Sequence, residues 1–116
     1  MGIRRVVPDL ACQSLDAAKD FYGDVFGLRP VMDHGWIVTL ADPQRPEMQI
    51  SLMTHDATAP VIPHASIQVG DVDACHAAAV RAGADIVHPL TDEPWGVRRF
   101  FVRDPDGNVL NVLSHP

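Results

Sequence analysis

The sequence predicts an α+β protein: two tandem β-α-β-β-β modules form a curved mixed sheet around a concave cleft, with the helices on the outside. Three observations lead to this prediction. A segment recurs 57 residues later, each half contains one amphipathic helical pattern, and three strand-like segments follow each helix. A chain of 116 residues has the length of one domain built from two half-size units.

The repeat is clearest where each helix begins. The letters SLDA at residues 14–17 align with DVDA at residues 71–74, and each segment follows an extended apolar stretch. Ser14 and Asp71 are good N-caps, because their side chains accept a hydrogen bond from a free N–H of the first turn. Apolar residues at helical spacing then define the predicted core faces: Leu15, Ala18, Tyr22 and Val25 in the first helix, and Val72, Cys75, Ala79 and Ala82 in the second.

Strands are expected around both helices. In the first half they cover residues 6–13, 28–34, 36–41 and 48–55, and in the second half residues 64–70, 85–90, 97–103 and 108–114. These spans give a single domain with module one at 1–57, a linker at 58–63 and module two at 64–116. One module alone would leave a sheet face uncovered, so each module needs the other.

Composition and charge exclude several classes of protein. An apolar fraction of 47% with 21% charged residues excludes disorder, and no apolar run approaches the roughly 20 residues of a membrane span. The first residues, MGIRRVVPDLACQ, do not form a signal peptide, so a cytoplasmic location is expected. A net charge of −6 without a basic cluster argues against nucleic acid. Cys12 and Cys75 are expected to be reduced and to lie in the interior.

Strand alternation predicts which side chains line the cleft. If His64 points inward, so do Ser66 and Gln68, and the matching strand of module one turns Val7 and Asp9 inward. A last hairpin closed with Arg103 opposite Asn108 would pair Phe100 with Asn111 and Arg98 with Leu113, and would place Phe101 under the second helix. The predicted ligand-binding residues are Trp36, Gln49, Ser51, Met53, His64, Gln68, Trp95, Arg98, Phe100 and Asn111. An apolar cleft with a few polar groups is typical of a small-molecule site.

Three segments carry a family resemblance: SLDAAKDFYGDVFGLRP, PHASIQVGDVDACHAAAVRAGADI and EPWGVRRFFVRDPDGNVLNVL. Together they resemble the vicinal-oxygen-chelate superfamily of glyoxalases, bleomycin-resistance proteins and extradiol dioxygenases. The segment Pro94-Trp95-Gly96 followed by Arg98-Arg99-Phe100 is most similar to the bleomycin-resistance branch, which implies a role in antibiotic resistance. The resemblance covers essentially the whole chain, in order, and implies the same paired modules as the repeat.

The resemblance also implies where a metal would bind. Enzymes of the superfamily hold a divalent metal with four ligands, and the corresponding positions here are Val7, Ser51, His64 and Asn111. Only His64 is a good ligand, whereas an open catalytic site normally needs three protein ligands. The prediction is therefore no metal and no cofactor, with one divalent metal around His64 as the alternative. His34, His55 and His88 are expected to be surface or strand-end histidines, and His76 and His115 to be solvated.

Two functions follow. The first is a metal-free protein that binds or sequesters an aromatic or cationic compound, with no catalytic residue. The alternative is a metal-dependent lyase, isomerase or dioxygenase with an atypical ligand set around His64. Trp36 and Trp95 either stack on such a ligand or belong to the core. Arg98 either binds a ligand carboxylate or carbonyl or pairs with an acid such as Asp9. A homodimer is also expected, since two modules leave open sheet edges.

Overall fold

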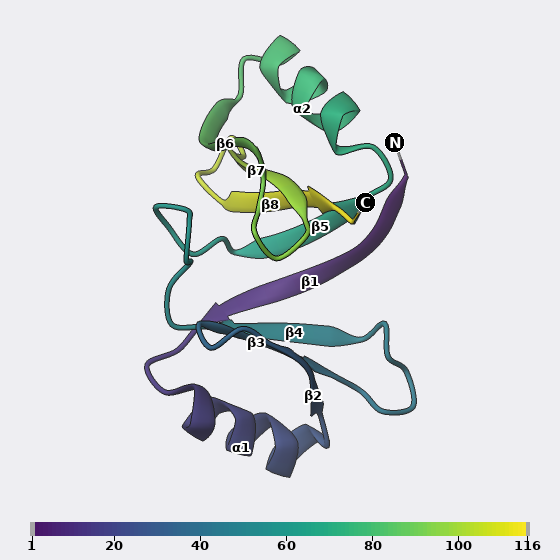
Figure 1. The fold of residues 1–116 in the computed structure, drawn as a ribbon, viewed down its shortest axis with the longest axis vertical. Helices are drawn as coiled ribbons and strands as arrows, with labels where there is room; N and C mark the ends of the chain where they lie inside the picture. The colour runs from purple at the N-terminus through teal and green to yellow at the C-terminus, as the bar shows by residue number, and fades with distance from the viewer. Residues whose placement is uncertain (1, 116) are drawn as a thin grey trace. The chain divides into compact units, whose positions relative to one another are not determined.

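The computed structural model describes residues 2–115, which form two helices and eight strands. The chain runs β1-α1-β2-β3-β4 and then β5-α2-β6-β7-β8 (Figure 1). Both parallel and antiparallel pairs occur, so the predicted α+β class, the two β-α-β-β-β modules and the mixed pairing are confirmed. Within residues 2–115, neither helix has the length and apolar character needed to cross a membrane.

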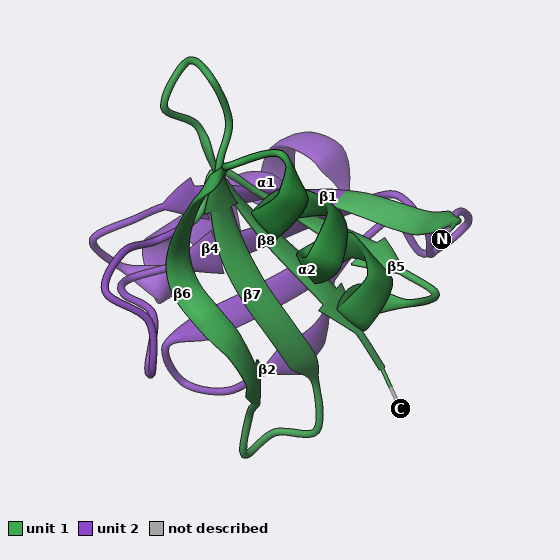
Figure 2. Ribbon diagram, turned by 90° about the horizontal axis from the view of Figure 1, so that it is seen from above, with its two compact units in different colours: residues 1–6, 63–116 green, residues 7–62 purple. Residues whose placement is uncertain are grey.

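The chain divides into two compact units, coloured separately in Figure 2. Unit 2 comprises residues 7–62, and unit 1 comprises residues 1–6 and 63–116, so β1 (Ile3–Ala11) begins in unit 1 and continues into unit 2. The helix of unit 2 is α1 (Leu15–Phe26) and the helix of unit 1 is α2 (Val72–Arg81).

The sheet of unit 2 has the strand order β2-β3-β4-β1. Its strands β2 (Arg29–Asp33), β3 (Ile37–Ala41) and β4 (Gln49–Met53) are antiparallel, and β4 runs parallel to β1. In unit 1 the order is β5-β8-β7-β6. There β5 (Ala65–Val69) is parallel to β8 (Val109–Ser114), while β7 (Arg98–Arg103) is antiparallel to both β8 and β6 (Asp85–Asp92).

Both predicted helix caps are confirmed. The Ser14 Oγ accepts a hydrogen bond from the N–H of Ala17 at 3.1 Å, and the Asp71 carboxylate accepts one from the N–H of Ala74 at 3.0 Å. Each bond satisfies one of the N–H groups that a helix start leaves without a partner. Helix α1 ends at Gly27, whose φ of 72° is left-handed and therefore favours glycine.

The predicted core faces of the helices are largely confirmed. Three residues of α1, at 15, 18 and 22, pack on the buried strand residues 38, 40 and 52, and α2 packs residues 72, 75 and 79 on Phe100 and Val112. Two members were wrong. Val25, in the last turn of α1, is 55% exposed and does not belong to the core cluster beneath the helix, and Ala82 is an exposed C-cap residue.

The predicted register of the last hairpin was wrong by one residue. In the structure Arg103 lies opposite Val109, Phe101 opposite Asn111 and Phe100 opposite Val112. Asn108 belongs to the turn instead: its main chain and side chain both donate to the Asp104 carboxylate, at 2.9 and 2.8 Å. Adding one residue to the turn moves every side chain of β7 to the opposite face.

Candidate functional site

In unit 2, the sheet face away from α1 carries three of the predicted ligand-binding residues. Gln49, Ser51 and Met53 alternate with the residues that pack beneath α1. The Ser51 hydroxyl lies 2.8 Å from the Thr39 hydroxyl of the neighbouring strand, and both side chains are buried. Met53 is buried as well, and Gln49 donates to the carbonyl of Pro46 at 2.9 Å.

Trp36 lies one residue before β3, outside the strand in which the sequence placed it. Its ring lies near two histidines, with centroid distances of 6.5 Å to His34 and 6.3 Å to His55. The two histidines, one in the turn before β3 and one after the end of β4, are exposed, as expected of surface or strand-end histidines, and Trp36 is half-buried. Whether Trp36 binds a ligand stays a prediction.

In unit 1, His64, Gln68 and Asn111 share the sheet face away from α2, as predicted from strand alternation. Ser66 lies opposite Asn111 in the parallel pair of β5 and β8, and its hydroxyl accepts a hydrogen bond from the Asn111 amide nitrogen at 3.0 Å. The other end of that amide, Oδ1, is buried and has no partner among the described residues. A buried acceptor without a donor costs about 1–3 kcal/mol, so this atom marks a place where a bound group would be stabilised.

His64 makes two contacts with one main-chain unit. Its N–H donates to the carbonyl of Val109 at 2.8 Å, and its ring Nδ1 accepts the N–H of Val109 at 2.9 Å. A neutral imidazole has only one nitrogen with a free lone pair, and here that nitrogen is Nδ1. Nε2 then carries the hydrogen and is a donor.

Arg98 and Phe100 do not lie on this face, so their predicted place in the cleft was wrong. The register of β7 turns Phe100 under α2, where it packs on Val69 and Val112. Arg98 reaches the helix itself and bonds to Asp73 at 2.9 Å and Asp92 at 3.2 Å. These two carboxylates raise the pKa of the Arg98 guanidinium above its ordinary value, Asp73 contributing most.

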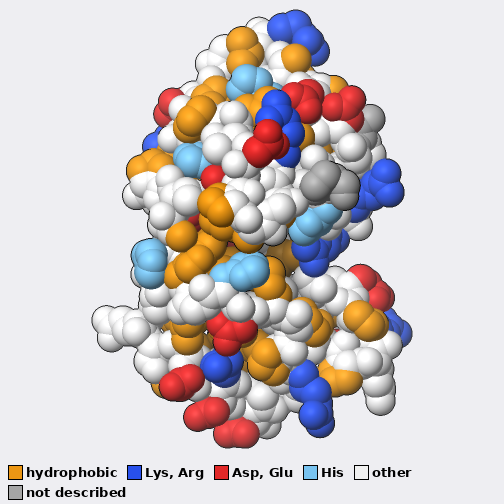
Figure 3. All heavy atoms as spheres, in the orientation of Figure 1, with side chains coloured by type: hydrophobic (Ala, Val, Ile, Leu, Met, Phe, Trp, Pro, Cys, Tyr) orange, Lys and Arg blue, Asp and Glu red, His pale blue; other side chains and the backbone are white. Residues whose placement is uncertain are grey.

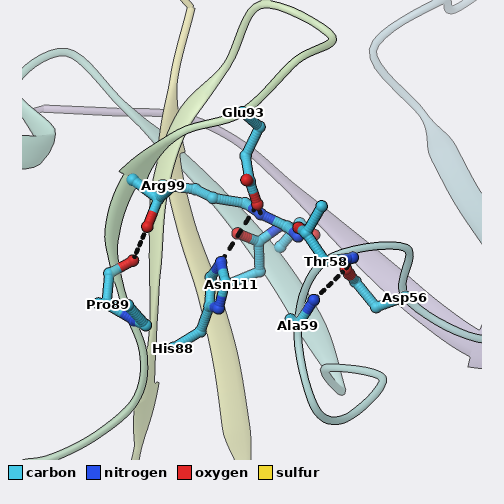
Figure 4. A network of polar contacts seen from close by, with 10 residues as sticks. Asp56, Thr58, Ala59, His88, Pro89, Glu93, Arg99 and Asn111 are labelled. Atoms are coloured by element: carbon cyan, nitrogen blue, oxygen red, sulfur yellow. Dashed lines mark hydrogen bonds and ion pairs between the residues drawn. The ribbon is translucent and has the colours of Figure 1, made fainter.

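The same register brings a buried polar cluster onto the face, and sequence reasoning missed it. The Arg99 Nε donates to Glu93 Oε2 at 2.6 Å, and His88 Nε2 lies 3.2 Å from the same oxygen (Figure 4). Side-chain exposures are 4% for Arg99, 2% for Glu93 and 8% for His88. The expectation of a surface or strand-end position for His88 was therefore wrong. A charged pair this deeply buried requires mutual hydrogen bonding to offset its desolvation.

Two aromatic rings complete this cluster. The Arg99 guanidinium carbon lies 4.9 Å from the ring centroid of Trp95 and 4.8 Å from that of Phe101, within the range of cation–π attraction. Phe101 is the cross-strand neighbour of Asn111, and the Asn111 side chain lies beside the cluster in Figure 4. The sequence does carry one signal for this cluster, the adjacent arginines of β7. One of two neighbouring residues in a half-buried strand must point inward, so one of these arginines had to be buried.

The four positions that the resemblance assigns to a metal do not fit one. Val7 has no donor atom, and the Ser51 hydroxyl is engaged with Thr39. The free lone pair of His64 is used by the main chain, and Asn111 offers only a neutral amide oxygen. Divalent zinc or iron in a catalytic site takes several imidazole, thiolate or carboxylate ligands. Within residues 2–115, no three His, Cys, Asp or Glu side chains converge as a metal site would require.

The two cysteines are free, as predicted, but they are only partly buried rather than interior. Cys12 packs with the core beneath α1, and burial raises the pKa of its thiol above the ordinary value. A thiol in this environment is a weaker nucleophile at neutral pH.

Comparison with known proteins places these features in a family context. The model of the Glyoxalase/Bleomycin resistance protein/Dioxygenase superfamily matches residues 2–112. No protein with curated function matches the sequence.

Among solved structures, the chain is similar to an NAD-dependent benzaldehyde dehydrogenase from Legionella pneumophila, with a TM-score of 0.75 and 17% identity over 96% of this chain and 99% of that one. It is also similar to a glyoxalase/bleomycin resistance protein/dioxygenase superfamily member from Vibrio splendidus 12B01, with a TM-score of 0.72 and 21% identity over 97% of this chain and 99% of that one. A methylmalonyl-CoA epimerase variant of Streptomyces coelicolor, in complex with 2-nitronate-propionyl-CoA, has a TM-score of 0.72 and 18% identity over 98% of this chain and 99% of that one. Identities this low establish a shared fold.

Proposed function

Because this chain belongs to the glyoxalase/bleomycin resistance protein/dioxygenase superfamily, we propose that it is a metal-free member that binds a small aromatic or cationic molecule. The observation that supports this proposal is the donor set at the family's metal positions. It contains one imidazole, and the lone pair of that imidazole already accepts the N–H of Val109 at 2.9 Å. A protein with these residues has the means to bind a ligand by shape and hydrogen bonding rather than through a metal.

The polar groups of the site favour a ligand that carries a hydrogen-bond donor. The buried Asn111 Oδ1 is an acceptor that needs an N–H or O–H group, supplied directly or through one water. The nearby positive charge of Arg99 is already paired with the carboxylate of Glu93, so this cluster does not favour an anionic ligand. Trp36 and Trp95 are both half-buried, and aromatic or cationic groups stack on rings of this kind, as the Arg99 guanidinium does on Trp95 at 4.9 Å.

Metal dependence is the first test. We expect protein purified without an affinity tag to contain no stoichiometric metal by plasma mass spectrometry. We also expect its melting temperature to be the same in chelator and in added zinc, nickel, manganese or iron(II). A melting temperature raised by one ion, and lowered again in His64→Ala, would replace this proposal with the metal-dependent lyase, isomerase or dioxygenase alternative.

Ligand binding is the second test, with metal-free bleomycin as the cationic aromatic probe. We expect bleomycin to quench tryptophan fluorescence with saturation, and Asn111→Leu to weaken binding about tenfold while changing stability by less than about 1 kcal/mol. Gln44→Leu, which replaces an exposed amide in the loop before β4, is the matched control and should bind like the natural chain. If Asn111→Leu bound bleomycin as tightly as the natural chain, Asn111 would not belong to the binding site. If bleomycin did not bind at all, this result would count against aromatic and cationic ligands.

We also propose that the protein is a homodimer, since the sheets of both units end in edge strands, β2 in unit 2 and β6 in unit 1. Size-exclusion chromatography with light scattering should give twice the chain mass. A mass of 12.6 kDa at micromolar concentration would overturn this proposal.

A further inference from the structure

A cavity at one end of unit 1 is separate from the polar cluster around Glu93. It has a volume of about 340 Å³ and is lined by Arg4 at the start of β1, by Gln68, Val69 and Gly70 at the end of β5, and by His115 just after β8. A volume of this size lies within the range of small-molecule sites. None of the functions considered above uses Arg4 or His115.

Main-chain pairing fixes the positions of these residues. Gln68 lies opposite Leu113 in the parallel pair of β5 and β8, so His115, two residues further along, is on the same face as Gln68. The N–H of Gly70 donates to the carbonyl of Gly2 at 3.1 Å, which ties the end of β5 to the segment that leads into Arg4. An arginine, a histidine and an amide are therefore held together by the sheet itself.

The charge of this cavity is opposite to that of the chain. The chain carries a net charge of −6, yet no carboxylate among residues 2–115 lines the cavity. Among residues 2–115, the charged groups at His115 are Arg4, which shares the cavity, and Arg5, whose charge acts on the imidazole. Over the face in view in Figure 3, acidic side chains (red) and basic side chains (blue) are interspersed. A concave site with one sign of charge concentrates ions of the other sign.

We propose that this cavity is a second binding site, for a small oxyanion: a carboxylate or phosphate group held by the Arg4 guanidinium, the His115 imidazolium and the Gln68 amide. The planar guanidinium matches the two oxygens of such a group with parallel N–H bonds. The His115 ring adds a second donor and, when protonated, a second positive charge. The Gln68 amide contributes N–H donors that are independent of pH.

The proposal predicts a direction for the pH dependence. Partial burial, followed by the charge of Arg5, lowers the pKa of His115 below its ordinary value in the free protein. A bound anion stabilises the protonated ring and raises that pKa, so binding takes up a proton. The affinity should therefore rise as the pH falls through the pKa of His115 and become constant at lower pH.

Sulfate is the first probe, because its charge does not change in this pH range. Titration followed by amide NMR should shift the signals of residues 68–70 and of His115 with saturation. Binding should be at least about fivefold tighter near pH 5.5 than near pH 8. Arg4→Gln should weaken binding about tenfold, and His115→Gln should remove the pH dependence. Acetate and inorganic phosphate, titrated separately, distinguish a carboxylate ligand from a phosphate ligand.

Arg45→Gln is the matched control, because it removes the same charge from an exposed loop of unit 2 and should leave sulfate binding unchanged. Arg4 and His115 are both exposed, so their variants should keep the spectrum of the folded protein. An absence of saturable shifts at about 20 mM sulfate, or equal affinity in Arg4→Gln and the natural chain, would overturn the proposal. If Arg45→Gln weakened sulfate binding as much as Arg4→Gln, the effect would come from net charge alone, and this result would also overturn the proposal.

Discussion

Ser51 in unit 2 and Asn111 in unit 1 occupy matching places in their sheets, each on the last strand of its module and on the face away from the helix. The cross-strand neighbour of Ser51 is Thr39, and the two hydroxyls lie 2.8 Å apart. The neighbour of Asn111 is Phe101, which has no polar atom, and the Asn111 Oδ1 is left without a partner. The same backbone plan thus carries a satisfied polar pair in one unit and an unsatisfied acceptor in the other.

The other buried polar groups differ as well. Unit 1 buries the ion pair of Arg99 and Glu93 beside His88, whereas unit 2 buries the neutral pair of Thr39 and Ser51 together with the carboxyl group of Asp9. The helix-facing sides are alike, because both pack apolar strand residues beneath a helix. A repeated module keeps its fold through the helix-facing core, and the opposite face is where the two copies have become chemically different.

The largest effect should separate buried from exposed aromatic residues. Phe100→Ala should lower the free energy of unfolding by about 4 kcal/mol, because it opens a cavity in the core between α2 and the sheet of unit 1. Phe21→Ala on α1 should cost less than about 1 kcal/mol, since Phe21 is 54% exposed. Urea denaturation of both variants measures the difference. Similar losses would contradict the assigned register of β7.

The next effect tests the buried ions of unit 1. Glu93→Gln should cost about 3 kcal/mol, because it removes the buried carboxylate to which Arg99 donates at 2.6 Å. Asp85→Asn, which removes a carboxylate from the exposed pair with Arg103, is the control and should cost well under 1 kcal/mol by the same measurement. A cost for Glu93→Gln no greater than that of the control would show that the pair is solvated in solution.

A smaller loss is expected for the matching polar pair in unit 2. Thr39→Val should cost about 1–2 kcal/mol, because the buried Ser51 hydroxyl then loses its partner. The double variant Thr39→Val with Ser51→Ala should recover part of that loss, since no unpaired hydroxyl remains. Additive losses in thermal unfolding would mean that the two hydroxyls do not interact.

The smallest effect on stability is expected from the salt bridges made by an aspartate in the first turn of each helix. Asp73 of α2 bonds to Arg98 of β7, whereas Asp16 of α1 pairs with Lys19 of the same helix at 3.4 Å. The hydrogen bond from Arg98 is the main cause that lowers the pKa of Asp73 below its ordinary value. Stability from this pair is therefore present above the ordinary carboxyl pKa and is lost as the pH falls through the lowered one.

Comparison of the natural chain with Asp73→Asn tests this pair. The natural chain should be slightly more stable near neutral pH, and the difference should shrink as the pH falls below about 4. Asp16→Asn is the control, because it removes a carboxylate that is 93% exposed, and it should change the melting temperature little near neutral pH. Acid titration of the melting temperature of Asp73→Asn and of the natural chain gives the difference, and a difference that grows at low pH would have the wrong sign.

The sequence by itself determined the local structure and the plan of the fold. Apolar residues at helical spacing placed both helices, and Ser14 and Asp71 marked their first turns because their side chains replace missing main-chain partners. Alternation within single strands grouped Ser66 with Gln68 and Gln49 with Ser51 on shared faces. The repeat implied the order of elements, since both copies of a module bury the same kind of surface.

Only the tertiary structure decided which face of β7 points toward α2. Alternation predicts which side chains of a strand share a face, but it does not predict which of the two faces points toward the helix. A shift of one residue in the pairing of β7 with β8 exchanges the two faces, and here that shift follows from the Asp104 carboxylate, which binds Asn108 within the turn. The shift exchanges Arg98 and Phe100 for Arg99 and Phe101 on the face of Asn111. Glu93 and His88 were likewise beyond the sequence, because His88 of β6 and Arg99 of β7 meet on one oxygen of the loop residue Glu93 only in the folded chain.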